Sequence, residues 1–145
     1  MSSEAIAVRE LRSYRAMKTR TENLQERLNA IDDKLHSIKA GIGDTPVKGG
    51  GSEGKYDGFI DLKIKIQGEI DRNRAEMAVI ERALDSLSAE DRMVIDCFFF
   101  EGHSPNEAKD ILRDRLYLED RQIWRIRKRA LHNYAYNSAS DMTVI

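Results

Sequence analysis

Apolar residues recur at alternating spacings of four and three in two long stretches of the chain. The first series consists of Leu24, Leu28, Ile31, Leu35, Ile38 and Ile42. The second consists of Ile66, Ile70, Met77, Ile80, Leu84 and Leu87, with Asn73 at one position of the same series. Such a heptad seam is typical of helices that pack along their length, and an asparagine within it can set the register or the number of partners. The pattern predicts two long helices.

Residues 41–58 separate the two series and hold seven of the nine glycines. This composition predicts a flexible loop. Two heptad helices joined by such a loop should fold back on each other. We therefore expect residues 1–87 to form a long antiparallel helical hairpin of the coiled-coil kind.

Residues 59–66 fit two descriptions, because isoleucines and a leucine alternate there with charged side chains. Alternation is a strand pattern, but no second strand candidate accompanies it, so we expect helix. Several of these apolar side chains would then point outward. They would favour a homodimer through the hairpin, and burial against the chain's own loop is an equally simple interpretation.

Residues 88–136 carry the start signals of three shorter helices. Ser88 with Asp91, and Ser104 with Glu107, match serine N-caps followed by an acidic residue, and Pro105 suits a first helical position. A break at 117–118 precedes a third helix. Residues 137–145 show no periodic pattern and are expected to be a disordered tail.

The last of these helices is expected to have one apolar and one cationic face. At 100° per residue, one side collects Ile123, Ile126, Ala130 and Tyr134, and the opposite side collects Arg121, Arg125, Lys128 and His132. Residues 113–132 hold seven Lys or Arg against three Asp or Glu, whereas the whole chain has a net charge of −1. This asymmetry favours a polyanionic partner, and a merely solvated helix face is the alternative.

Other functional classes find little support in the sequence. No apolar run approaches the ~20 residues that span a bilayer, and the start lacks a secretion signal, so a cytoplasmic protein is expected. Cys97 is the single cysteine and should be a buried thiol. The three histidines share no metal-ligand spacing with it, and the phosphate-loop-like GGGSEGK at 49–55 ends in Tyr56 rather than Ser or Thr. We expect no enzyme, no cofactor and no metal.

Residues 84–134, LDSLSAEDRMVIDCFFFEGHSPNEAKDILRDRLYLEDRQIWRIRKRALHNY, resemble a known family. They are similar to region 4 of sigma-70-type factors and, more closely, to the sigma-like ArpU and RinA regulators of phages of Gram-positive bacteria. The resemblance rests on Leu87, Gly102, the Ser104 cap and the Arg129-Ala130-Leu131 element. The sequence differs from the family at Glu119, where serine is common, and at Ile126-Arg127, where the apolar residue usually comes one step later.

The resemblance implies an all-α protein with a C-terminal three-helix helix-turn-helix domain at 88–136 that binds double-stranded DNA. The last helix would enter the major groove. Base edges would be read by Arg121, Gln122, Arg125 and Lys128, and phosphates would be held by Arg113, Arg129 and His132.

The expected function is that of a phage-type, sequence-specific transcription regulator in the cytoplasm of a bacterial host, with RNA polymerase as a further partner. Residues 85–110 are acidic and, by the resemblance, would face the polymerase or another protein. A solvated acidic face that keeps DNA on the correct side is an equally good interpretation. One alternative is a protein-interaction module that binds RNA polymerase or another protein. Another is a structural DNA-binding protein of phage packaging.

Overall fold

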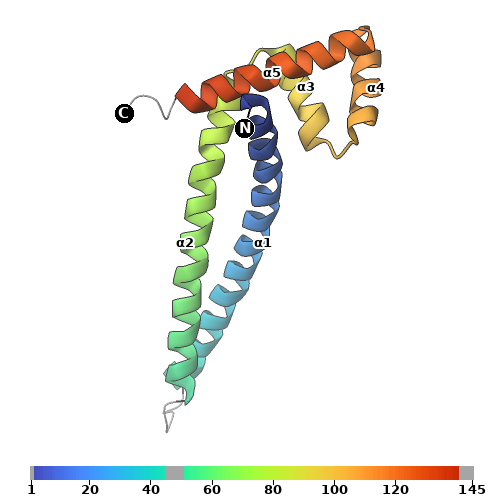
Figure 1. Ribbon diagram of the computed structural model, residues 1–145. Coiled ribbons are helices and arrows are strands. Elements are labelled where there is room, and N and C mark those ends of the chain that lie inside the picture. The colour runs from blue at the N-terminus through green and yellow to red at the C-terminus, as the bar shows by residue number, and fades with distance from the viewer. Residues whose placement is uncertain (1, 45–50, 141–145) are drawn as a thin grey trace. The chain divides into compact units, whose positions relative to one another are not determined.

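The computed structural model describes residues 2–44 and 51–140, and for 40–44, 51–53 and 139–140 it describes the backbone alone. Every regular element in the described part is helical, which confirms the all-α prediction (Figure 1). The elements are α1 (Ser3–Asp44), α2 (Gly51–Asp85), α3 (Ala89–Ile95), η1 (Asp96–Phe100, a π-helical turn), α4 (Pro105–Leu116) and α5 (Asp120–Ser140). None of the described helices combines the length and apolarity that crossing a membrane requires.

The chain divides into two compact units, and the division differs from the expected boundary at residue 87. One unit is Met1–Met17 together with Glu76–Ile145, and the other is Lys18–Ala75. The reason is that Ala7 and Leu11 of α1 are fully buried in the same apolar cluster as Leu84 of α2 and Tyr134 of α5. The first turns of α1 and the last turns of α2 therefore share a core with the C-terminal helices.

In the unit Lys18–Ala75, the parts of α1 and α2 that it contains pack through the predicted apolar series. Its core consists of Leu24, Leu28, Ile31, Ile66 and Ile70. Two ion pairs show that the segments run antiparallel, since Arg20 pairs with Glu69 at 2.6 Å and Asp32 pairs with Lys63 at 2.8 Å. Ion pairs between exposed side chains add little stability, so the apolar seam holds the unit together.

The segment 59–66 is helical throughout, so the strand-like alternation does not produce a strand. A helix satisfies every backbone donor and acceptor within the segment, whereas a strand would need a partner, and the described residues contain no strand. Ile66 is buried in the seam, while Ile64 is 65% exposed.

The predicted loop at 41–58 is wrong at both of its ends, which are helical. α1 continues to Asp44, α2 already begins at Gly51, and residues 45–50 lie outside the described residues. Glycine costs a helix only about 1 kcal/mol relative to alanine, and extending an existing helix is much easier than starting one. The glycine content indicated flexibility, but it did not prevent helix formation from either side.

Replacing Gly54 and Gly58 with alanine is expected to stabilise the protein by about 0.5–1 kcal/mol per site, because alanine loses less backbone entropy in a helix. A Cβ at either position would meet no atom within 4 Å. Urea denaturation followed by circular dichroism measures the change. Gly102→Ala serves as the opposite control, since Gly102 has φ +82° and alanine should destabilise there. Unchanged or reduced stability in the Gly54 and Gly58 variants would contradict a helical start of α2.

The unit that contains the C-terminal helices follows the predicted start signals. Ser88 Oγ accepts a hydrogen bond from the Asp91 N–H at 3.2 Å, and Ser104 Oγ accepts one from the Glu107 N–H at 3.3 Å. Tyr117 adopts a left-handed conformation at the end of α4, φ 55° and ψ 42°, which confirms the predicted break. α5 crosses both α3 and α4 (Figure 1).

α5 is longer than predicted, because it runs to Ser140 instead of ending near 136. The prediction of a disordered tail is therefore wrong for 137–140, and 141–145 lie outside the described residues. Local contacts explain the difference: Asn137 Nδ2 donates to the Ala83 carbonyl at 3.5 Å, and Ser138 Oγ donates to the Ala135 carbonyl at 3.1 Å. These bonds support one more turn of helix.

Candidate nucleic-acid interface

α5 has the two faces that its sequence predicts. Its apolar face is buried, with exposed fractions between 0 and 8% for Ile123, Ile126, Ala130 and Tyr134. The opposite face is exposed and carries Arg121, Arg125, Lys128 and His132. The Tyr134 hydroxyl donates to Glu10 Oε2 at 2.8 Å, and burial together with this carboxylate raises the pKa of Tyr134. The buried face thus holds α5 against the core, and the cationic face is exposed to solvent.

Gln122 has a structural role that was not predicted from the sequence. Its Oε1 accepts a hydrogen bond from the Glu119 backbone N–H at 2.9 Å. Glu119 immediately precedes α5, so this is the half of a capping box in which the third helical residue reaches back to the N-cap. The bond satisfies the backbone donor of Glu119, not the donors of the first helical turn that a serine cap would bind. The side-chain oxygen of Gln122 is consequently engaged and does not face a partner.

Arg113 is paired within the fold. Its guanidinium lies 3.5 Å from Asp120 and 3.8 Å from Asp110, and Lys109 lies 3.4 Å from Asp120. Asp120 is the first residue of α5, where an acidic side chain also interacts favourably with the helix dipole. This small network ties the end of α4 to the start of α5.

Arg129 forms shorter bonds within the fold than Arg113 does. Its Nη2 lies 2.6 Å from Asp91 and 2.8 Å from Glu90, and its Nε donates to Asp91 at 3.1 Å. The Asp91 side chain is only 3% exposed, and its other oxygen accepts from Asn133 Nδ2 at 3.1 Å. The bonds to Asp91 and Glu90 raise the pKa of Arg129. Arg129 therefore joins α3 to α5, which argues against the phosphate contact expected of it.

Arg127 belongs to the core edge, although it counts among the basic residues of this stretch. Its guanidinium lies 5.1 Å from the ring centre of Phe98, 5.4 Å from that of Phe99 and 5.7 Å from that of Trp124. It also pairs with Glu4 at 3.5 Å, and burial lowers its pKa. A cation that covers aromatic faces occupies the place where the resembled family has an apolar residue.

Trp124 packs against Phe98 with a centroid distance of 5.4 Å and remains 39% exposed. Trp124 thus lies at the edge of the core.

The remaining Lys and Arg side chains of α5 have no partner among the described residues. Within the residues that the structure describes, Arg121, Arg125 and Lys128 form no ion pair or side-chain hydrogen bond. Arg125 and Lys128 line a hollow of about 580 Å³ together with Arg129 and His132, and the start of α1 (Ser2, Ser3 and Glu4) forms its other wall. Of the seven residues predicted to bind DNA, Arg121, Arg125, Lys128 and His132 thus remain available.

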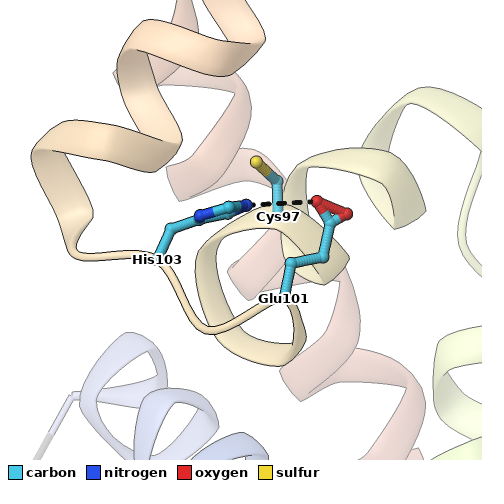
Figure 2. A group of neighbouring side chains, drawn as sticks. All are labelled: Cys97, Glu101 and His103. Atoms are coloured by element: carbon cyan, nitrogen blue, oxygen red, sulfur yellow. Dashed lines mark ion pairs between the residues drawn. The ribbon is translucent and has the colours of Figure 1, made fainter.

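Cys97 and His103, for which the sequence predicted no metal site, lie together with Glu101 in the structure. The thiol of Cys97, the carboxylate of Glu101 and the imidazole of His103 have ligand atoms within 4.8 Å of one another (Figure 2). Cys97 is buried, as predicted. The signal in the sequence is Cys-x₃-Glu-x-His: a spacing of four places two residues on one helix face, and Gly102 allows the chain to return.

Compared with protein-family models, with curated proteins and with solved structures, the chain matches none of them.

Proposed function

We propose that this protein is a sequence-specific, DNA-binding transcription regulator of the phage type that acts in the cytoplasm of a bacterial host. The observation that carries the proposal is the selective pairing of cations on α4 and α5. Arg113, Arg127 and Arg129 are held by acidic or aromatic groups, whereas Arg121, Arg125 and Lys128 share one exposed face without partners among the described residues. A group of unpaired cations on a rigid helix is what binding to phosphates and guanine edges requires.

In this proposal, α4 and α5 form a helix-turn-helix and α1 and α2 form a helical hairpin that precedes it. The short turn at Tyr117, the capped start of α4 and the apolar seat of α5 support the first assignment. The similarity of residues 84–134 to sigma region 4 supports the same assignment. α5 would enter the major groove, with Arg121, Arg125 and Lys128 at base edges and His132 near a phosphate.

The rival function is that of a protein-interaction module that binds RNA polymerase or another protein. It is favoured by the acidic residues between 85 and 110, but two of these are already paired, because Arg92 lies 3.2 Å from Asp85 and 3.0 Å from Asp96. A structural DNA-binding protein of packaging is the third candidate. It would share the phosphate contacts but show no preference among sequences.

Salt dependence tests the proposal. Fluorescence anisotropy of a labelled random-sequence duplex, titrated with the protein at several salt concentrations, measures the association constant. The logarithm of this constant should fall with the logarithm of salt concentration, with a slope of about −1 for each phosphate that the protein contacts. Failure of the folded protein to bind any duplex would favour the protein-interaction module, and binding without sequence preference would favour the packaging protein.

A further inference from the structure

A cluster of three different metal-ligand types lies at the junction of η1 and α4. Cys97 belongs to η1, Glu101 directly follows η1, and His103 precedes the cap of α4. Figure 2 shows the imidazole of His103 and the carboxylate of Glu101 facing each other, with Cys97 beside them. His103 Nε2 lies 3.6 Å from Glu101 Oε1, and all ligand atoms fall within 4.8 Å of one another.

The backbone at this junction is arranged so that the three side chains converge. The π-helical turn closes with a hydrogen bond from the Glu101 N–H to the Asp96 carbonyl at 3.0 Å. Such turns appear frequently at functional sites. Gly102 then adopts φ +82°, a conformation that residues with a side chain rarely adopt, and it reverses the chain so that His103 faces Cys97.

We propose that Cys97, Glu101 and His103 bind one divalent transition-metal ion of the zinc class, with a fourth position left to water. Thiolate, imidazole and carboxylate together are a ligand set that suits an ion of intermediate softness and disfavours magnesium or calcium. In a tetrahedral zinc site a sulfur and a nitrogen ligand lie about 3.5 Å apart.

The surroundings of His103 fit the role of a ligand. Its Nδ1, on the side of the ring away from Glu101, lies 3.9 Å from Glu107 Oε2. Metal-binding histidines usually direct their second nitrogen to a carboxylate, which fixes the tautomer and orients the ring. Glu107 lies in the first turn of α4, where its N–H is bound by the Ser104 cap. The bound ion would therefore link η1 to the start of α4.

Three features of the metal-free site oppose binding and must change when the ion enters. The Cys97 thiol donates a hydrogen bond to the Ala108 carbonyl at 3.7 Å and has to give it up. Arg115 Nη1 lies 3.5 Å from Glu101 Oε1 and has to release that carboxylate. The Cys97 thiol is protonated at neutral pH, because burial and the nearby Glu101 raise its pKa to about 11. On binding, the S–H bond breaks, the sulfur–metal bond forms, and the proton passes to solvent. No group is oxidised or reduced.

Cobalt titration of the full-length protein under reducing conditions tests the proposal, because Co²⁺ occupies zinc sites and absorbs light. We expect one ion per chain, a near-ultraviolet band from sulfur-to-cobalt charge transfer, visible bands of tetrahedral cobalt, and loss of all of them when Zn²⁺ is added. The charge-transfer band reports the Cys97 sulfur in the unaltered protein. The result therefore does not depend on whether a Cys97→Ser variant folds.

Variants locate the site. His103→Gln should abolish the tetrahedral spectrum, Glu107→Gln should weaken binding about 10-fold through the lost ring orientation, and Arg115→Gln should tighten it by freeing Glu101. His36→Gln and His132→Gln change the other two histidines and should leave the spectrum as it is. Absence of the charge-transfer band, or an unchanged spectrum in His103→Gln, would overturn the proposal. Both readouts are independent of DNA, so neither depends on the proposed function.

Discussion

Asp91→Ala is expected to lower the free energy of unfolding by about 3 kcal/mol, at the lower end of the range for breaking a buried, hydrogen-bonded charge pair. The change removes both bonds from Arg129 and the bond from Asn133. It also removes an acidic group from the first turn of α3, where it interacts favourably with the helix dipole. The cost stays at the lower end because Arg129 is half exposed and keeps its pair with Glu90.

Urea denaturation followed by the fluorescence of Trp124 measures this loss, since Trp124 is the single tryptophan and packs on the same core. Glu90→Ala is the matched control: Glu90 binds the same arginine from an exposed position and should cost less than about 1 kcal/mol. When Asp91→Ala is combined with Arg129→Ala, the loss of stability should be far from the sum of the two single losses. Equal losses for Asp91→Ala and Glu90→Ala would show that Asp91 does not join α3 to α5.

The paired charge reversal Arg125→Glu with Lys128→Glu is expected to lower the affinity for duplex DNA about 100-fold or more, since each lost base contact costs roughly 1–3 kcal/mol. Two positive charges beside the phosphates are also replaced by carboxylates, so the salt dependence should become shallower. Both side chains are exposed and form no pair among the described residues, so the fold should tolerate the change. Anisotropy titration measures both quantities, and circular dichroism checks the fold.

The matched control is Lys34→Glu with Lys39→Glu, which changes the net charge equally. These two lysines are exposed on α1, in the unit Lys18–Ala75. An equal loss of affinity in both double variants would mean that DNA responds to the overall charge, and the exposed face of α5 would then have no special role.

Features that depend on near neighbours in the sequence were predictable. The serine caps at Ser88 and Ser104 involve groups three residues apart, and the buried face of α5 follows from helical spacing alone. The apolar series of the long helices likewise identified the buried positions at Leu24, Leu28 and Ile31. In each case a local rule of geometry determines the outcome.

Features that depend on distant partners could not be predicted from the sequence. Arg129 looks like any other cation of the basic stretch until Asp91, 38 residues earlier, is placed beside it. The same is true of Arg127, which the rings of Phe98 and Phe99 cover. The charge of the sequence therefore predicts which helix carries the candidate interface. The structure shows which of its cations are paired and which are exposed.

Two further differences between the predicted and the observed structure arise at glycines, whose effect on the backbone is hard to predict from sequence. Glycine-rich composition predicted a loop over 41–58, yet helices extend into it from both sides. The juxtaposition of Cys97 and His103 depends on the left-handed backbone of Gly102, and a glycine in the sequence does not reveal its φ angle.

Selection of bound sequences from a pool of random duplexes tests the central claim most directly, because it asks at once whether the protein binds DNA and whether it distinguishes bases. The unaltered protein should enrich a defined sequence over successive rounds, and the Arg125→Glu/Lys128→Glu variant should enrich none. If the folded, unaltered protein enriches no sequence over this variant, the exposed face of α5 does not read DNA and the account is wrong.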